Sequence, residues 1–174
     1  SIETIFHILM PHPVVIHLHT IKPLAILIQK NYKEILRKLL KNDLSYEFID
    51  YVKPGTELGK SIYQKLKSNN DIDVFFLQNH GIIIGGDSIK QADDILKLII
   101  LKVEEYLSNK NLNELIKKNN DAPKTLFIND KVFNLLDDKE LNTIVHSDKL
   151  ISHVEHSWAY APDHVVFLGS KPFI

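Results

Sequence analysis

Two short apolar runs joined by a polar turn constrain the fold of this chain more than any other feature. Residues 74–77 and 82–84 are each of strand length, and the sequence Gln-Asn-His-Gly separates them. An apolar pattern of helical period follows at residues 88–107, and Ser88 and Gln91 at its start have capping-box spacing. A hairpin-like pair of buried strands before a long amphipathic helix predicts a sheet with helices packed against it.

The remaining elements complete an α/β pattern. Further helices are expected at residues 1–9, from Pro23 onward, and at residues 32–40, 58–66 and 131–141, with further strands at residues 14–19, 46–52 and 164–169. Because strands and helices mix without a regular βαβ rhythm, the central sheet is expected to be at least partly antiparallel. The length of 174 residues suits one domain.

Composition excludes several classes of protein. The formal net charge is -1, so neither a nucleic-acid partner nor a membrane partner is expected. No cysteine is present, which excludes disulfides, thiolate metal sites and a cysteine nucleophile. There is no Gly-x-Gly-x-x-Gly sequence, so no nicotinamide cofactor site is expected.

Three histidines suggest metal chemistry. His17 and His19 alternate on a predicted strand, so their side chains share a face at roughly 6.6–6.8 Å spacing and can converge on one ion. His80 lies between the two apolar runs, where Gly81 is expected to adopt a backbone conformation closed to other residues and to place the imidazole at the hairpin end. Each histidine alone also fits an ordinary surface or turn residue, and the combination carries the hypothesis. Glu3, on a short helix, fits a solvated residue equally well.

Four stretches together resemble the class II aldolase/adducin family. They are SIETIFHILMPHPVVIHLHT (residues 1–20), YVKPGTELGKSI (51–62), FFLQNHGIIIGGDSIKQADDIL (75–96) and YAPDHVVFLG (160–169). The pattern is most similar to a sub-group in which the aldolase domain is fused to a short-chain dehydrogenase, as in rhamnulose-phosphate aldolase/dehydrogenases. The resemblance implies an α/β fold of three layers, α/β/α, with a largely antiparallel central sheet.

The resemblance also implies a catalytic site. His17, His19 and His80 match the metal ligands of the family, for a divalent ion that we expect to be Zn²⁺. Glu3 matches the carboxylate that moves a proton at the substrate carbon. The expected reaction is that of a lyase, which cleaves a hydroxy-ketone, expected to be a sugar phosphate, through a metal-stabilised enediolate.

Other residues were weighed for the edge of this site. His7 matches a family position near the site, and Tyr160 matches a residue of the terminal strand, although it lies one residue farther from the following proline than is usual. His153, His156 and His164 belong to a polar carboxyl-terminal stretch in which an ordinary surface role is the stronger interpretation, with contact to a neighbouring subunit's site as the alternative.

Three alternatives to an aldolase stay open. A sugar-phosphate 4-epimerase has the same fold but usually carries aspartate where Glu3 stands. A dehydratase of the methylthioribulose type keeps the glutamate and the histidines. A non-catalytic, adducin-like module would be expected to lose metal ligands, whereas this chain keeps them.

The resemblance further implies an oligomeric state, a cellular location and a domain organisation for the protein. A cytoplasmic homotetramer with a small carbohydrate substrate is expected. The sequence begins at Ser1, directly against the motif that contains Glu3. We therefore expect residues 1–174 to form a single domain of this type that lacks its amino-terminal portion, which carries loops that hold a substrate phosphate or carboxylate.

Overall fold

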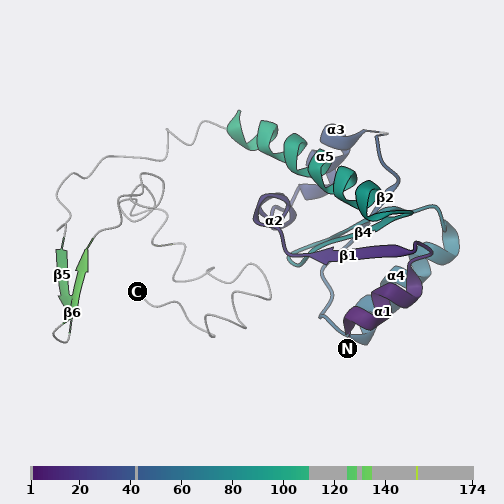
Figure 1. Cartoon of the computed structure of the whole chain (residues 1–174), viewed down its shortest axis with the longest axis horizontal. Coiled ribbons are helices and arrows are strands. Elements are labelled where there is room, and N and C mark those ends of the chain that lie inside the picture. The colour runs from purple at the N-terminus through teal and green to yellow at the C-terminus, as the bar shows by residue number, and fades with distance from the viewer. Residues whose placement is uncertain (1, 42, 110–124, 129–130, 135–151, 153–174) are drawn as a thin grey trace.

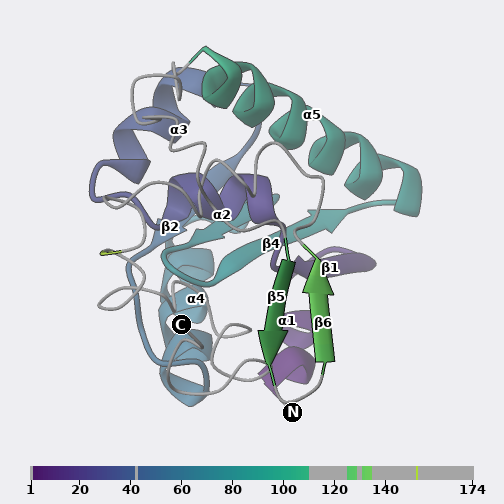
Figure 2. The same cartoon turned by 90° about the vertical axis from the view of Figure 1, so that its left-hand side faces the viewer.

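The computed structural model describes residues 2–41, 43–109, 125–128, 131–134 and 152 (Figures 1 and 2). In chain order the elements are α1 (Ile2–Leu9), β1 (Val14–Leu18), α2 (Ile21–Leu27), α3 (Tyr32–Leu40), β2 (Tyr46–Ile49), α4 (Thr56–Ser68), β3 (Val74–Leu77), β4 (Gly81–Gly86), α5 (Ile89–Ser108), β5 (Thr125–Ile128) and β6 (Lys131–Asn134). Among these residues, no helix combines the length and apolar character needed to cross a bilayer.

The main sheet has four strands in the order β1-β4-β3-β2. The pairs β1–β4 and β3–β4 are antiparallel, while β2 and β3 are parallel. The parallel pair needs a crossover connection, and α4 supplies it between the two strands. The prediction of a largely antiparallel central sheet is therefore confirmed, with β1 and β2 at the edges.

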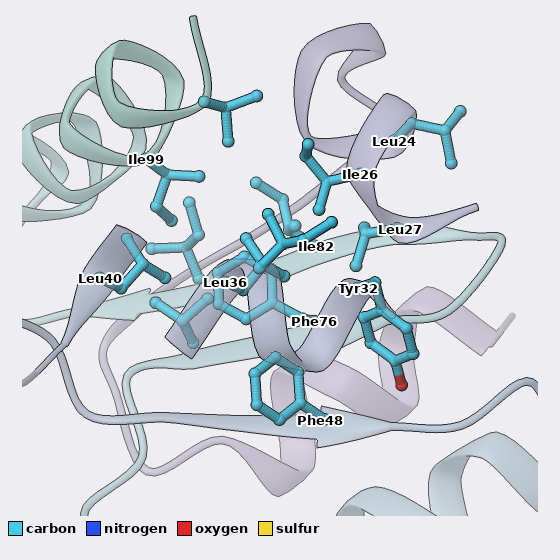
Figure 3. Packing of buried hydrophobic residues seen from close by; sticks show 14 of the residues in the cluster. Leu24, Ile26, Leu27, Tyr32, Leu36, Leu40, Phe48, Phe76, Ile82 and Ile99 are labelled. Carbon is cyan, nitrogen blue, oxygen red and sulfur yellow. The ribbon is translucent and has the colours of Figure 1, made fainter. Parts of the chain in front are cut away.

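Helices cover both faces of the sheet, so the three-layer prediction is also confirmed (Figure 1). On one face, Phe76 of β3 and Ile82 of β4 pack among buried residues of α2, α3 and α5 (Figure 3). On the other face, Phe75 and Ile83 pack against residues of α1 and α4. Both faces of β3 and β4 are buried, which explains why these strands read as nearly continuous apolar runs.

The helix predicted at residues 131–141 is wrong over its first four residues. Lys131–Asn134 is strand β6, antiparallel to β5, with Leu126 opposite Phe133 and Phe127 opposite Val132. Val132 and Phe133 are residue types that favour strands, and this preference outweighs the helical spacing of the apolar residues. The remainder of that segment and the strand predicted at residues 164–169 lie outside the described residues.

Candidate metal centre

The carboxyl-terminal end of β1 and the residue just after it present two histidines, His17 and His19, on the face that α1 and α4 cover. Ile16 and Leu18 pack toward the core on the α2, α3 and α5 side. Because side chains alternate along a strand, His17 and His19 point to the opposite face, where His17 is in register with Ile83 of β4. Both imidazoles are half-buried and emerge at the carboxyl end of β1.

His80 lies in the turn between β3 and β4. Leu77 and Gly81 form the last strand pair, and the His80 N–H donates to the Leu77 carbonyl at 3.2 Å. The left-handed backbone conformation falls on Asn79, with φ 54°, and not on Gly81, so that prediction was wrong. Asparagine tolerates this conformation better than most residues. His80 is only 5% exposed, so the turn buries its imidazole.

Gly81 is required for a different reason, which is space. A Cβ atom at this position would lie 2.4 Å from the Leu18 carbonyl oxygen and 2.8 Å from Cδ2 of His19. Distances under 3.0 Å are not seen for real Cβ atoms. The absence of a side chain at Gly81 thus allows β1 to approach closely enough for His19 to lie beside His80.

The three imidazoles form a compact triangle. Their ring centroids lie 4.8 Å apart for His17 and His19, 5.0 Å for His17 and His80, and 4.9 Å for His19 and His80. One ligand nitrogen from each ring lies within 4.8 Å of the others. Within the described part of the chain, this is the one group of three or more metal-ligating side chains close enough to hold an ion.

The donor set suits a divalent ion. Three imidazole nitrogens are a known ligand set for catalytic metal sites. Ligands at about 2.1 Å around a tetrahedral ion lie roughly 3.4 Å apart, so modest ring rotations from the present geometry complete such a site. The residues present therefore fit a divalent metal, and the cluster could bind one.

Helix α1 closes the site from the side. Phe6 packs edge-on against His17, with ring centroids 5.0 Å apart. Glu3 lies in α1 three residues before Phe6. His7 is in the last turn of the same helix and is exposed. Sequence reasoning missed Phe6, although its spacing of three from Glu3 on a helix was the available signal.

Other candidate residues lie elsewhere. Tyr160, like His153, His156 and His164, falls outside the described residues. A separate hollow of about 520 Å³ lies between the end of α3 and β2 and contains none of the three clustered histidines. Its lining residues are Arg37, Lys41, Leu44, Ser45, Tyr46, Glu47 and Phe48.

Comparison with known proteins identifies the family. The family described as Class II Aldolase and Adducin N-terminal domain matches residues 1–100, which is more than half of the chain. The chain belongs to the class II aldolase and adducin family. The matched residues include His17, His19 and His80, so the whole histidine cluster lies within the part of the chain that the family model covers.

Two relatives show the extent of the likeness. A solved structure, the N-terminal class II aldolase domain of a conserved protein from Thermoplasma acidophilum, is 29% identical with a TM-score of 0.53, over 62% of this chain and 48% of that one. The curated protein of Bacillus subtilis (strain 168) called uncharacterized oxidoreductase YuxG is 26% identical over 110 residues, which are 63% of this chain and 16% of that protein. The chain therefore spans about half of the first and less than a fifth of the second.

Proposed function

We propose that this chain is a metal-dependent class II aldehyde-lyase that cleaves a hydroxy-ketone of the sugar-phosphate class. The observation that carries the proposal is the convergence of His17, His19 and His80, whose ligand nitrogens all lie within 4.8 Å of one another. These residues come from an edge strand and from a turn far away in the sequence, and the fold brings them to one point.

The proposed metal is Zn²⁺, held by His17, His19 and His80. Three neutral imidazoles suit zinc and leave coordination positions open for substrate oxygens, as catalytic zinc sites require. When bound, the ion supplies a Lewis acid that polarises the substrate carbonyl and stabilises the negative charge of an enediolate. The low exposure of His80 limits competition from water on that side.

Glu3 is the proposed acid/base. It matches the family's catalytic carboxylate, and α1, the helix that contains it, contacts the site through Phe6 and His17. In the cleavage direction the hydroxyl group gives up its O–H proton to solvent and becomes the carbonyl of the aldehyde product. The bond between that carbon and the ketone's α-carbon breaks, and its electron pair stays with the α-carbon fragment as the enediolate. Glu3 then gives a proton to the α-carbon, and it removes the proton in the reverse direction.

The alternatives differ in their products. Glutamate at position 3 favours an aldolase over an epimerase, because the epimerases usually have aspartate there. Retention of all three histidines argues against a non-catalytic module. A dehydratase has the same residues, so the reaction products must distinguish it.

The proposal extends to assembly and location. Within the part of the chain that the structure describes, β1 pairs with a strand on one side only, and unpaired strand edges are usually covered. We propose a homotetramer in which a second copy contributes to this cover. A phosphorylated substrate favours the cytoplasm, because charged phosphates do not cross the apolar part of a bilayer. We treat residues 1–174 as one domain of this type.

Metal analysis followed by a substrate panel tests the proposal. The purified chain is expected to contain about one zinc per chain, and His80→Ala is expected to abolish this content. A panel of ketose 1-phosphates then distinguishes cleavage, which yields two carbonyl products, from epimerisation and from loss of water. Purified protein that neither contains nor takes up a divalent metal would refute the proposal.

A further inference from the structure

The turn that carries His80 is held by neighbouring elements. The backbone N–H of Gln78 donates to the Ile49 carbonyl at 3.0 Å, at the end of β2. The backbone N–H of Asn79 donates to the Leu27 carbonyl at 3.4 Å, at the end of α2. A metal ligand on a turn is only as well oriented as the turn itself, so these contacts bear on the geometry of the site.

One further hydrogen bond takes the place of a backbone–backbone bond that would continue the pairing of β2 with β3. In a parallel ladder, the residue after the pair Ile49–Leu77 would donate its N–H to the Ile49 carbonyl and would accept the Tyr51 N–H on its own carbonyl. Gln78 makes the first bond with its backbone. For the second, the Tyr51 N–H donates instead to the side-chain oxygen Oε1 of Gln78 at 3.1 Å.

The use of the Gln78 side chain as acceptor, in place of its backbone carbonyl, has a structural reason. The chain leaves the ladder at Asn79, whose φ of 54° turns the backbone away from β2 and toward the position of His80. The half-buried Gln78 side chain keeps the strands tied together at the point where the main chain departs.

We propose that Gln78 is a positioning residue of the metal centre. Its amide oxygen holds the β3–β4 turn against the end of β2 and thereby fixes the orientation of the His80 imidazole. The inference rests on the proposed function, because it requires His80 to be a metal ligand.

Metal binding to the full chain tests this role through isosteric variants. Gln78→Met keeps the length of the side chain and removes the acceptor, whereas Gln78→Glu keeps an acceptor oxygen. Gln91→Met is the matched control, because the Gln91 side-chain oxygen also accepts a backbone N–H, that of Asp87 at 2.6 Å, beyond the opposite end of β4. Zn²⁺ affinity is measured by competition with a chelator, and Co²⁺ added alone reports ligand geometry through its visible absorption.

Gln78→Met is expected to bind Zn²⁺ about 10-fold more weakly and to change the Co²⁺ spectrum, at the lower end of the effect of losing an outer-shell partner. Gln78→Glu is expected to restore both readouts, and Gln91→Met to match the wild type. If Gln78→Met does not fold, Gln78→Asn, whose amide is one methylene too short to reach Tyr51, is expected to show the same loss.

Two results would overturn the inference. One is wild-type affinity and spectrum in a Gln78 variant that lacks the contact, and the other is an equal loss in Gln91→Met. A wild-type chain that binds neither Co²⁺ nor Zn²⁺ is a separate result, because it refutes the proposed function itself.

Discussion

Replacement of Gly81 by alanine should damage the fold and the metal centre together. The added Cβ would lie 2.4 Å from the Leu18 carbonyl oxygen, whereas ordinary contacts begin at 3.4 Å. A displacement of about 1 Å is therefore needed, and the atom in the way belongs to the backbone of a paired strand, so it cannot rotate aside. Overpacking of this kind costs typically about 1–3 kcal/mol, and a rigid backbone neighbour places this substitution near 3 kcal/mol.

The same displacement separates two metal ligands. His19 follows Leu18 directly, so movement of β1 away from β4 also moves its imidazole away from His80. Metal sites tolerate errors of about 0.5 Å, so a shift of about 1 Å should weaken Zn²⁺ binding by about 10-fold or more. A stability loss near 3 kcal/mol corresponds to a fall in Tm of roughly 6–12 °C for a domain of this size.

Gly85→Ala provides the matched control on the same strand. A Cβ there would lie 2.2 Å from Nδ1 of His12, an equally close approach near the opposite end of β4, but to a side chain instead of the backbone, so a smaller loss of stability is expected. It would disturb the contact between His12 Nε2 and Asp73 Oδ1 (3.1 Å) but not the histidine cluster. Thermal melts with zinc and with chelator, followed by competition titrations, give both quantities. The reasoning is refuted if Gly81→Ala binds zinc as tightly as the wild type, or if Gly85→Ala weakens binding equally.

Three further variants test other parts of the molecule. Glu3→Gln should retain zinc and lower kcat by about 10²–10⁴-fold, and unchanged turnover would exclude Glu3 as the acid/base. Phe76→Ala should cost about 3–5 kcal/mol in urea unfolding, because Phe76 is fully buried between helices and sheet, and a loss under 1 kcal/mol would contradict this packing. A hydrogen bond from Lys33 holds the pKa of Asp50 below its ordinary value despite partial desolvation. The ionised Asp50 carboxylate therefore stabilises the fold at pH values above the pKa that it has in the unfolded chain. This stabilisation is lost as the pH falls through the lower pKa that it has in the folded chain. Asp50→Asn should cost under about 1 kcal/mol at pH 7 because the site is exposed, and the difference from wild type should narrow at pH 3.

Patterns set by local physics were predictable from the sequence. Strands β3 and β4 were found because both of their faces are buried, so every position is apolar. Helix α5 was found from its apolar period and from Ser88, whose side chain accepts the Gln91 N–H. The convergence of His17, His19 and His80 followed from strand alternation together with the family motif.

Features that depend on contacts between distant segments were not predictable. The parallel pairing of β2 with β3 is set by the crossover through α4, and nothing within either strand specifies it. The role of Gly81 depends on the approach of Leu18, a residue far away in the chain, so the sequence suggested unusual φ and ψ where the real requirement is space. The positioning role proposed for Gln78 could not be predicted, because its hydrogen-bond partner, Tyr51, follows a different strand.

The placement of the histidine cluster has a thermodynamic consequence. An ion shared by His19 and His80 would close a loop of about 60 residues and would act on the chain as a cross-link between two parts of the sequence. For a cross-link that closes a loop of this length, the loss of chain entropy in the unfolded state corresponds to about 4 kcal/mol of stabilisation at 25 °C. The proposed ion would therefore stabilise the fold as well as take part in catalysis. Unfolding of this domain should then release its metal, and metal supply would limit how much of the chain is folded.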